Sequence, residues 1–136
     1  ACCAGVDAIV IPEHNSVSIT ADAIKTSAGA LFHIPVCREK STLDAVKQLK
    51  ENGYKIVAAT EKGARNYTET DFTVPVAIVM GAEETGISNE VLKIADDLAA
   101  IPIIGEISSL NVSVAAGVMI YEGVRQRMNQ VQTPTA

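Results

Sequence analysis

The sequence predicts an α/β fold, in which a mostly parallel sheet carries helices on both faces. Three runs rich in valine and isoleucine, at residues 6–11, 54–60 and 75–80, have the length of strands. These runs are largely apolar instead of alternating with polar residues, which is typical of strands buried on both faces of a parallel sheet. Segments with helical spacing of apolar residues separate or follow them, so strands and helices are expected to alternate along the chain.

The first half of the chain contains two predicted helices and one further short strand. Residues 20–31 are rich in alanine and are expected to be weakly helical, and residues 34–37 are expected to form a strand. Ser41 is expected to cap a helix whose apolar residues recur every three positions, and Gly53 to end it. Residues 61–73 are polar and mixed in character, and we predict a loop there.

The second half is predicted to hold a short helix, a fourth strand and a long helix. Ser88 is expected to cap the short helix, and its apolar face comprises Val91, Leu92, Ala95 and Leu98. Residues 99–104 are predicted as an apolar strand that includes a proline, and residues 110–128 as the long helix. The apolar stripe of the long helix is Val114, Val118, Tyr121 and Val124. We expect one domain over residues 1–129 and a polar tail over residues 130–136.

The composition limits the class of protein. The chain has 136 residues, of which 48% are hydrophobic and 20% are charged, and this excludes a disordered chain. Its apolar runs fall short of the roughly 20 residues that cross a membrane. The formal net charge of −5 argues against nucleic acid held by bulk positive charge, and leaves open a local basic site or a partner domain. The odd set Cys2, Cys3 and Cys37 suits reduced thiols in the cytoplasm, and the absence of zinc-site spacing predicts no metal.

Three segments follow predicted strands, where open α/β sheets bind their ligands: residues 60–63, 81–86 and 104–111. Residues 81–86 have two glycines instead of the three of a dinucleotide fingerprint, and lack the lysine of a P-loop. The paired acids Glu83 and Glu84 would repel a phosphate. This segment therefore favours a ligand with a positive centre or with little negative charge.

Residues 108–113, Ser-Ser-Leu-Asn-Val-Ser, are unusually polar for the junction of an apolar strand with an apolar helix. Helix capping alone is one explanation, but the run offers more polar groups than one helix start uses. Together with residues 78–88 and 101–107, this run resembles the SpoU (TrmH-like) branch of the SPOUT RNA methyltransferases. Within that branch, residues 108–115 and 122–127 are most similar to the enzymes that methylate a guanosine 2′-hydroxyl in 23S rRNA.

The resemblance implies a fold and a reaction. Members transfer a methyl group from S-adenosylmethionine to a ribose 2′-hydroxyl in rRNA or tRNA, tie the C-terminal segment into a trefoil knot, and form homodimers near the C-terminal helix. Gly81, Ile101 and Leu110 match the positions that hold the cofactor, with Thr60 as an additional wall. Glu83, Ser109 and Asn111 match the polar positions around the reacting centre. We assign Ser109 and Asn111 to positioning, because an amide cannot accept a full proton at neutral pH. For Glu83 the alternative is a carboxylate favoured by the dipole of a helix N-terminus.

Other readings remain open. The family's first motif, with the arginine that is the usual candidate for activating the hydroxyl, precedes the stretch that matches residues 1–5. The motif and an N-terminal strand are therefore expected to be missing from this chain. The alternative functions are a tRNA 2′-O-methyltransferase, a non-catalytic RNA-binding or dimerisation module, and a flavodoxin-like domain.

Basic residues that could contact RNA phosphates are Arg38, Lys40, Lys62, Arg65, Arg125 and Arg127. For each basic residue the alternative is a solvated face of the protein. Tyr67 could stack on a base, and the alternative is an exposed ring without a binding role.

Overall fold

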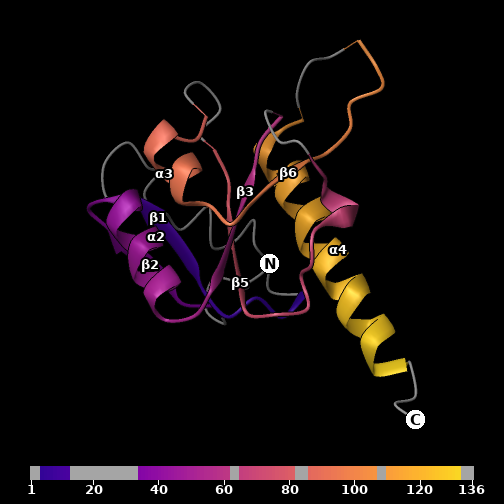
Figure 1. The fold of residues 1–136 in the computed structure, drawn as a ribbon, viewed down its shortest axis with the longest axis horizontal. Coiled ribbons are helices and arrows are strands. Elements are labelled where there is room, and N and C mark those ends of the chain that lie inside the picture. The colour runs from indigo at the N-terminus through magenta and orange to yellow at the C-terminus, as the bar shows by residue number, and fades with distance from the viewer. Residues whose placement is uncertain (1–3, 13–33, 62–64, 82–85, 107–109, 133–136) are drawn as a thin grey trace, which may run out of the picture. The chain divides into compact units, whose positions relative to one another are not determined.

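The computed structural model describes residues 4–12, 34–61, 65–81, 86–106 and 110–132 (Figure 1). The chain divides into two compact units, Ala1–Ala45 and Val46–Ala136. We describe each unit by itself. The helix predicted at residues 20–31 lies outside the described residues.

The first unit contains a parallel pair of strands. Strand β1 (Ile9–Pro12) pairs with β2 (Val36–Glu39), with Ile9 opposite Val36. Both predicted strands therefore form, each displaced toward its C-terminal end. Helix α2 (Thr42–Glu51) follows, and the Ser41 hydroxyl accepts a hydrogen bond from the Asp44 N–H at 3.2 Å, which confirms the predicted cap.

The second unit contains a four-stranded parallel sheet in the order β4-β6-β3-β5. Its strands are β3 (Lys55–Ala59), β4 (Arg65–Asn66), β5 (Val76–Val79) and β6 (Asp97–Ala100). The strands predicted at residues 54–60 and 75–80 are confirmed as β3 and β5. The parallel arrangement is confirmed as well.

Both faces of this sheet are covered, as predicted. On one face Val57, Phe72 and Ala99 form a buried cluster with Met119 of helix α4 (Val112–Gln132). Ile56 and Ala58 alternate with Val57 along β3, so they point to the other face, and they are fully buried too. Figure 1 shows α4 on one side of the sheet and α3 (Asn89–Ile94) on the other.

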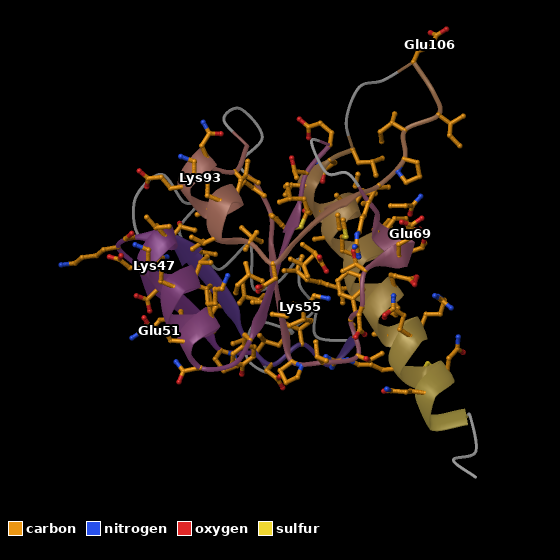
Figure 2. The ribbon with its side chains drawn as sticks, viewed as in Figure 1. Lys47, Glu51, Lys55, Glu69, Lys93 and Glu106 are labelled. Carbon is orange, nitrogen blue, oxygen red and sulfur yellow. The ribbon has the colours of Figure 1, made fainter. Side chains whose placement is uncertain are left out.

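Charged pairs hold the amino edge of the sheet. Lys55, labelled in Figure 2, begins β3 and lies 2.8 Å from a carboxylate oxygen of Asp97 at the start of β6. Its ammonium group also donates to the Asp71 carbonyl at 3.1 Å. Asp96 accepts a hydrogen bond from the Ile56 N–H at 2.7 Å, and this bond lowers the pKa of its carboxyl group. These side chains make their contacts at the amino ends of the strands. The ligand site is predicted at the opposite, carboxyl ends.

The prediction of a loop over residues 61–73 was wrong in part. Two residues pair with β6 as strand β4, and Tyr67–Glu69 form a short 3-10 helix, η3. The Asn66 side chain starts that helix by accepting hydrogen bonds from the N–H and hydroxyl groups of Thr68. A polar edge strand of two residues leaves no apolar pattern in the sequence, which is why the prediction missed it.

The boundary between α3 and β6 also differs from the prediction. Helix α3 ends at Ile94, because Ala95 turns to extended backbone and Asp96 is held by Ile56. Leu98 therefore belongs to β6 instead of to the helix. Strand β6 ends at Ala100, not at residue 104, and Ile104 beyond it is 97% exposed. Pro102 lacks the N–H group that a continued strand would need.

Helix α4 runs from Val112 to Gln132, three residues into the predicted tail. Its buried side is formed by Met119, Glu122 and Gly123, whereas Val114 and Tyr121 of the predicted stripe are more than half exposed. No helix in the described ranges is both long enough and apolar enough to cross a membrane. The single domain over residues 1–129 stays a prediction. So does the knot, because residues 82–85 and 107–109 lie outside the described ranges.

Candidate active site

The carboxyl ends of three neighbouring strands meet at one edge of the sheet. Thr60 follows β3, Gly81 comes two residues after β5, and Ile101 follows β6. Ala58 of β3 is level with residues of both adjacent strands, and all pairs are parallel. The fold therefore brings together three of the four residues predicted to hold a cofactor, although they lie 21 and 20 residues apart in the sequence.

Thr60 and Ile101 are held in place by the sheet and its core. The Thr60 N–H donates to the Ala99 carbonyl at 3.0 Å, which continues the pairing of β3 with β6 past the last strand residue. Thr60 is half-buried. Ile101 is also half-buried and packs against the cluster of Val57, Phe72, Ala99 and Met119. Both positions directly follow strands of the packed sheet.

Gly81 cannot carry a side chain in this structure. A Cβ atom there would lie 2.8 Å from the carbonyl carbon of Gly86, 2.9 Å from its α-carbon and 3.0 Å from the Ile87 nitrogen. All three are backbone atoms, so no side-chain rotation relieves the collision. The requirement for glycine at this position therefore has an internal cause, the close approach of the chain's own backbone, in addition to any approach of a ligand.

Leu110 and Asn111 stand at the start of α4, after the connection that leaves β6. The Asn111 side-chain oxygen accepts a hydrogen bond from the Ser113 N–H at 2.8 Å, and its carbonyl accepts one from Ala115 at 2.9 Å. Asn111 is thus the N-cap of α4. Leu110 and Ile104 of the same connection expose apolar side chains. Glu83 and Ser109 lie outside the described residues.

The described positions have the chemistry of a site for an uncharged heterocycle. Thr60, Gly81, Ile101 and Leu110 carry no charge, and they offer main-chain groups and apolar surface. Such linings are typical of nucleoside pockets, where a few main-chain groups fix the orientation. Within the described ranges, no group of three or more His, Cys, Asp or Glu residues is arranged to hold a metal ion.

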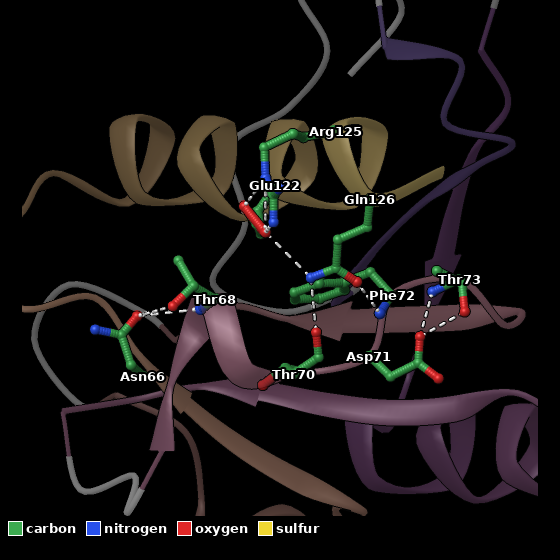
Figure 3. Close-up of polar contacts among 9 residues, drawn as sticks. All are labelled: Asn66, Thr68, Thr70, Asp71, Phe72, Thr73, Glu122, Arg125 and Gln126. Carbon is green, nitrogen blue, oxygen red and sulfur yellow. Dashed lines mark hydrogen bonds and ion pairs between the residues drawn. The ribbon is translucent and has the colours of Figure 1, made fainter. Parts of the chain in front are cut away.

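A polar cluster on α4 escaped the sequence analysis. The Gln126 amide donates to the Thr70 carbonyl and accepts from the Phe72 N–H, both at 2.8 Å (Figure 3). Glu122 is 7% exposed and accepts hydrogen bonds from Arg125 and Gln126. The hydrogen bonds from Arg125 lower the pKa of the Glu122 carboxyl group, with a smaller contribution from Gln126. In the sequence, the cluster is indicated only by Glu122 and Gln126 lying one helical turn apart. Polar residues with this spacing are common on surface helices, so the spacing alone does not predict the cluster.

Two of the candidate RNA contacts, Arg125 and Arg127, also bond within the fold. The Arg125 guanidinium is bound to Glu122, and Arg127 donates to the carbonyls of Phe72 and Val74, each at 2.9 Å. Both arginines are exposed as well, so these contacts within the fold do not exclude a contact with RNA. Tyr67 is half-buried and packs against the core, so only part of its ring is exposed. Arg38, Lys40 and Arg65 are exposed, and Lys62 lies outside the described residues.

Comparisons with known proteins identify the family. The family model described as the SpoU rRNA Methylase family matches residues 1–121. A protein of Staphylococcus saprophyticus named as a TrmH family tRNA/rRNA methyltransferase is 42% identical over 123 residues, which are 90% of this chain and 49% of that protein. The chain thus spans about half the length of the curated relatives that it matches.

Solved structures share the fold. The SpoU methyltransferase AviRb from Streptomyces viridochromogenes, in complex with the cofactor AdoMet, is 30% identical with a TM-score of 0.82, over 93% of this chain and 52% of that one. A solved RNA 2′-O ribose methyltransferase is 31% identical with a TM-score of 0.83, over 93% of this chain and 48% of that one. From the match over residues 1–121 and the shared fold, we conclude that this chain belongs to the SpoU rRNA methylase family.

Proposed function

We propose that this chain is the cofactor-binding and catalytic part of an S-adenosylmethionine-dependent RNA methyltransferase that modifies the ribose 2′-hydroxyl of a guanosine in 23S rRNA. The observation that carries the proposal is the meeting of Thr60, Gly81 and Ile101 at the carboxyl ends of three adjacent parallel strands. Open α/β sheets bind nucleotide-like ligands at that edge. A family member with the same fold was solved with AdoMet.

The residues present suit this cofactor. S-adenosylmethionine supplies a methyl group on a sulfonium centre, which carries its own leaving group and no phosphate. The site accordingly needs no basic side chain, and Thr60, Gly81, Ile101 and Leu110 provide none. Ile101 and Leu110 offer apolar surface to the adenine ring, and the main chain beyond β3 and β5 offers hydrogen-bonding groups.

The remaining task of the protein is to orient the ribose hydroxyl and to help it lose a proton. We assign Asn111 to positioning, because its side-chain oxygen already holds the first turn of α4 through Ser113. Glu83 and Ser109 are proposed to lie around the reacting centre. The proposed substrate is RNA, with rRNA favoured by the resemblance and tRNA as the alternative, and the proposed location is the cytoplasm.

We also propose that the protein forms a homodimer through α4. Val114, Tyr121 and Met128 are 53%, 52% and 57% exposed and recur every seven residues. This spacing places them along one side of the helix. A stripe of exposed apolar side chains on a helix is typical of a protein interface, and it supports the dimer that the resemblance implies.

Calorimetric titration with S-adenosylhomocysteine tests the cofactor site. We expect saturable binding near one site per chain. The complete protein is then incubated with S-adenosylmethionine and either 23S rRNA or tRNA transcripts, and the nucleosides are analysed by mass spectrometry. 2′-O-methylguanosine formed on rRNA alone supports the proposal, and formation on tRNA alone supports the alternative. A protein that melts cooperatively but binds no cofactor would instead be a non-catalytic module.

A further inference from the structure

Gly86 is required by its backbone conformation. Its φ angle is +68°, in the left-handed region that glycine enters freely and other residues enter at a cost. An ideal Cβ atom at Gly86 would meet no atom within 4 Å, so space is not the reason for glycine here.

Gly81 must be glycine for a different reason, because it has no space for a side chain. Both glycines take part in one contact. The backbone of Gly81 lies outside the left-handed region, but a Cβ atom there would collide with the main chain of Gly86 and Ile87. With its left-handed backbone conformation, Gly86 thus places its main chain against Gly81. The contact is backbone on both sides, so no side chain can adjust to absorb a change in it.

The contact is anchored at both ends. Strand β5, which leads into Gly81, is paired with β3 up to Val79. After Ile87, the Ser88 hydroxyl accepts a hydrogen bond from the Val91 N–H at 3.4 Å and begins α3. A change of backbone angle at Gly86 therefore cannot be taken up on the side of α3 without loss of that cap.

We propose that Gly86 is a positioning residue for the cofactor. Its left-handed backbone holds the main chain of Gly81 at the end of β5, level with Thr60 at the end of β3, where the cofactor binds. The inference rests on the proposed function of this edge of the sheet. It assigns to Gly86 an effect on cofactor affinity without contact between Gly86 and the cofactor.

The test compares wild-type protein with Gly86→Ala and Gly86→Asn in calorimetric titrations with S-adenosylhomocysteine. Asparagine enters the left-handed region several times more readily than alanine does. We expect the Kd of Gly86→Ala to rise about tenfold, which corresponds to about 1.4 kcal/mol. We expect Gly86→Asn to stay within about threefold of the wild type, because it keeps the backbone conformation. A purely structural role would not produce this rescue by asparagine in the Kd.

Gly53 provides a matched control. It has a φ angle of +89° and open space around its Cβ position, like Gly86, but it precedes the amino end of β3. Gly53→Ala is expected to lower the melting temperature and to leave the Kd unchanged. Gly81→Ala is expected to bind more weakly than Gly86→Asn, since even a methyl group there meets the main chain.

Each outcome decides the matter. Wild-type binding together with an unchanged Kd for folded Gly86→Ala overturns the inference and leaves the proposed function intact. An equal loss of affinity in Gly86→Asn and Gly86→Ala also overturns it, because the left-handed backbone would then not be the cause. A wild-type protein that melts cooperatively and binds no S-adenosylhomocysteine overturns both proposals.

Discussion

Asn111 combines a structural contact with a proposed functional one. Its side-chain oxygen caps α4 through the Ser113 N–H, and it is also one of the residues that the family resemblance places at the reacting centre. The cap does not prevent a functional contact, because the side-chain amide nitrogen stays available to a second partner. The two roles can therefore be separated by substitution.

We predict that Asn111→Ala lowers the free energy of unfolding by about 1 kcal/mol, the usual cost of a lost N-cap. We further predict that it slows methyl transfer by about 100-fold through misplacement of the reacting groups. The control is Asn111→Ser, which restores the cap but not the amide, and is expected to recover stability without recovering the rate. Denaturant unfolding and single-turnover kinetics give the two quantities. A wild-type rate in Asn111→Ala would remove this residue from the site.

Phe72 is the largest fully buried side chain among the described residues of the second unit. It packs in the cluster with Val57, Ala99 and Met119, and a Cβ atom at Gly123 of α4 would lie only 3.7 Å from its ring carbon Cγ. We predict that Phe72→Ala lowers the free energy of unfolding by about 3–5 kcal/mol, because it removes buried surface and leaves a cavity. Val74→Ala, at a half-exposed neighbouring position, is the control and is expected to cost far less. Equal effects of the two changes in urea unfolding would contradict this account of the core.

At the scale of elements, α4 is fastened to residues 70–74 by polar groups instead of by apolar packing alone. Gln126 satisfies the Thr70 carbonyl and the Phe72 N–H, and Arg127 satisfies the Phe72 and Val74 carbonyls. These backbone groups belong to the segment between η3 and β5, which has no strand partner of its own in the described ranges. The helix therefore takes the place of a neighbouring strand for that segment.

Gln126→Ala should consequently destabilise the protein by about 1–3 kcal/mol, the cost of leaving partly buried backbone groups unpaired. Gln130 lies one turn further along α4 and is exposed, so Gln130→Ala is a matched control with an expected change near zero. Thermal melting with a fixed protein concentration compares the two variants. Equal melting temperatures would show that water replaces the Gln126 contacts without cost.

Glu122 makes stability depend on pH in a known direction. Hydrogen bonds from Arg125 lower the pKa of its carboxyl group below the ordinary value of 4.5. The native state thus binds fewer protons than the unfolded state in that range, so this group stabilises the fold above about pH 4.5, and its contribution is lost as the pH falls through the lowered pKa. Asp96, whose pKa is lowered from 3.8, acts in the same direction at lower pH.

We predict that Glu122→Gln is less stable than the wild type at pH 7 and that the difference shrinks as the pH falls below about 4.5. Urea unfolding across this range measures it. The remaining slope in the variant reports Asp96 and the other carboxyl groups. A difference that is constant with pH would mean that the charge of Glu122 does not contribute.

At the scale of the whole molecule, Val114, Tyr121 and Met128 form a stripe of exposed apolar side chains on α4. We predict that wild-type protein at micromolar concentration has the mass of a dimer in light scattering, and that Tyr121→Asp has the mass of a monomer. Gln130→Asp adds the same charge to an exposed polar position of the same helix and is expected to stay dimeric. A monomeric wild type would contradict the proposed interface.

The buried elements of the fold could be predicted from the sequence, because burial requires runs or stripes of apolar residues. Strands β3 and β5 are apolar runs, and Ser41 and Ser88 cap helices through the hydrogen bonds that their positions indicated. The errors lie at the surface and at boundaries. Strand β4 has two polar residues, and α3 ends early because Asp96 is bound by a residue 40 positions away. No local pattern records such a partner.

The sequence by itself determined the fold class, the family and the segments that form the candidate site, because apolar periodicity, glycines and polar runs are local properties of the chain. Only the tertiary structure decided which of these residues meet. It placed Thr60, Gly81 and Ile101 at neighbouring strand ends, and it showed that Arg125 and Arg127 bond to Glu122 and to the carbonyls of Phe72 and Val74. It also gave Gly81 an internal reason to be glycine, since the backbone that excludes a side chain there comes from Gly86 and Ile87. Contacts between distant segments depend on strand order and register, which no stretch of sequence specifies alone.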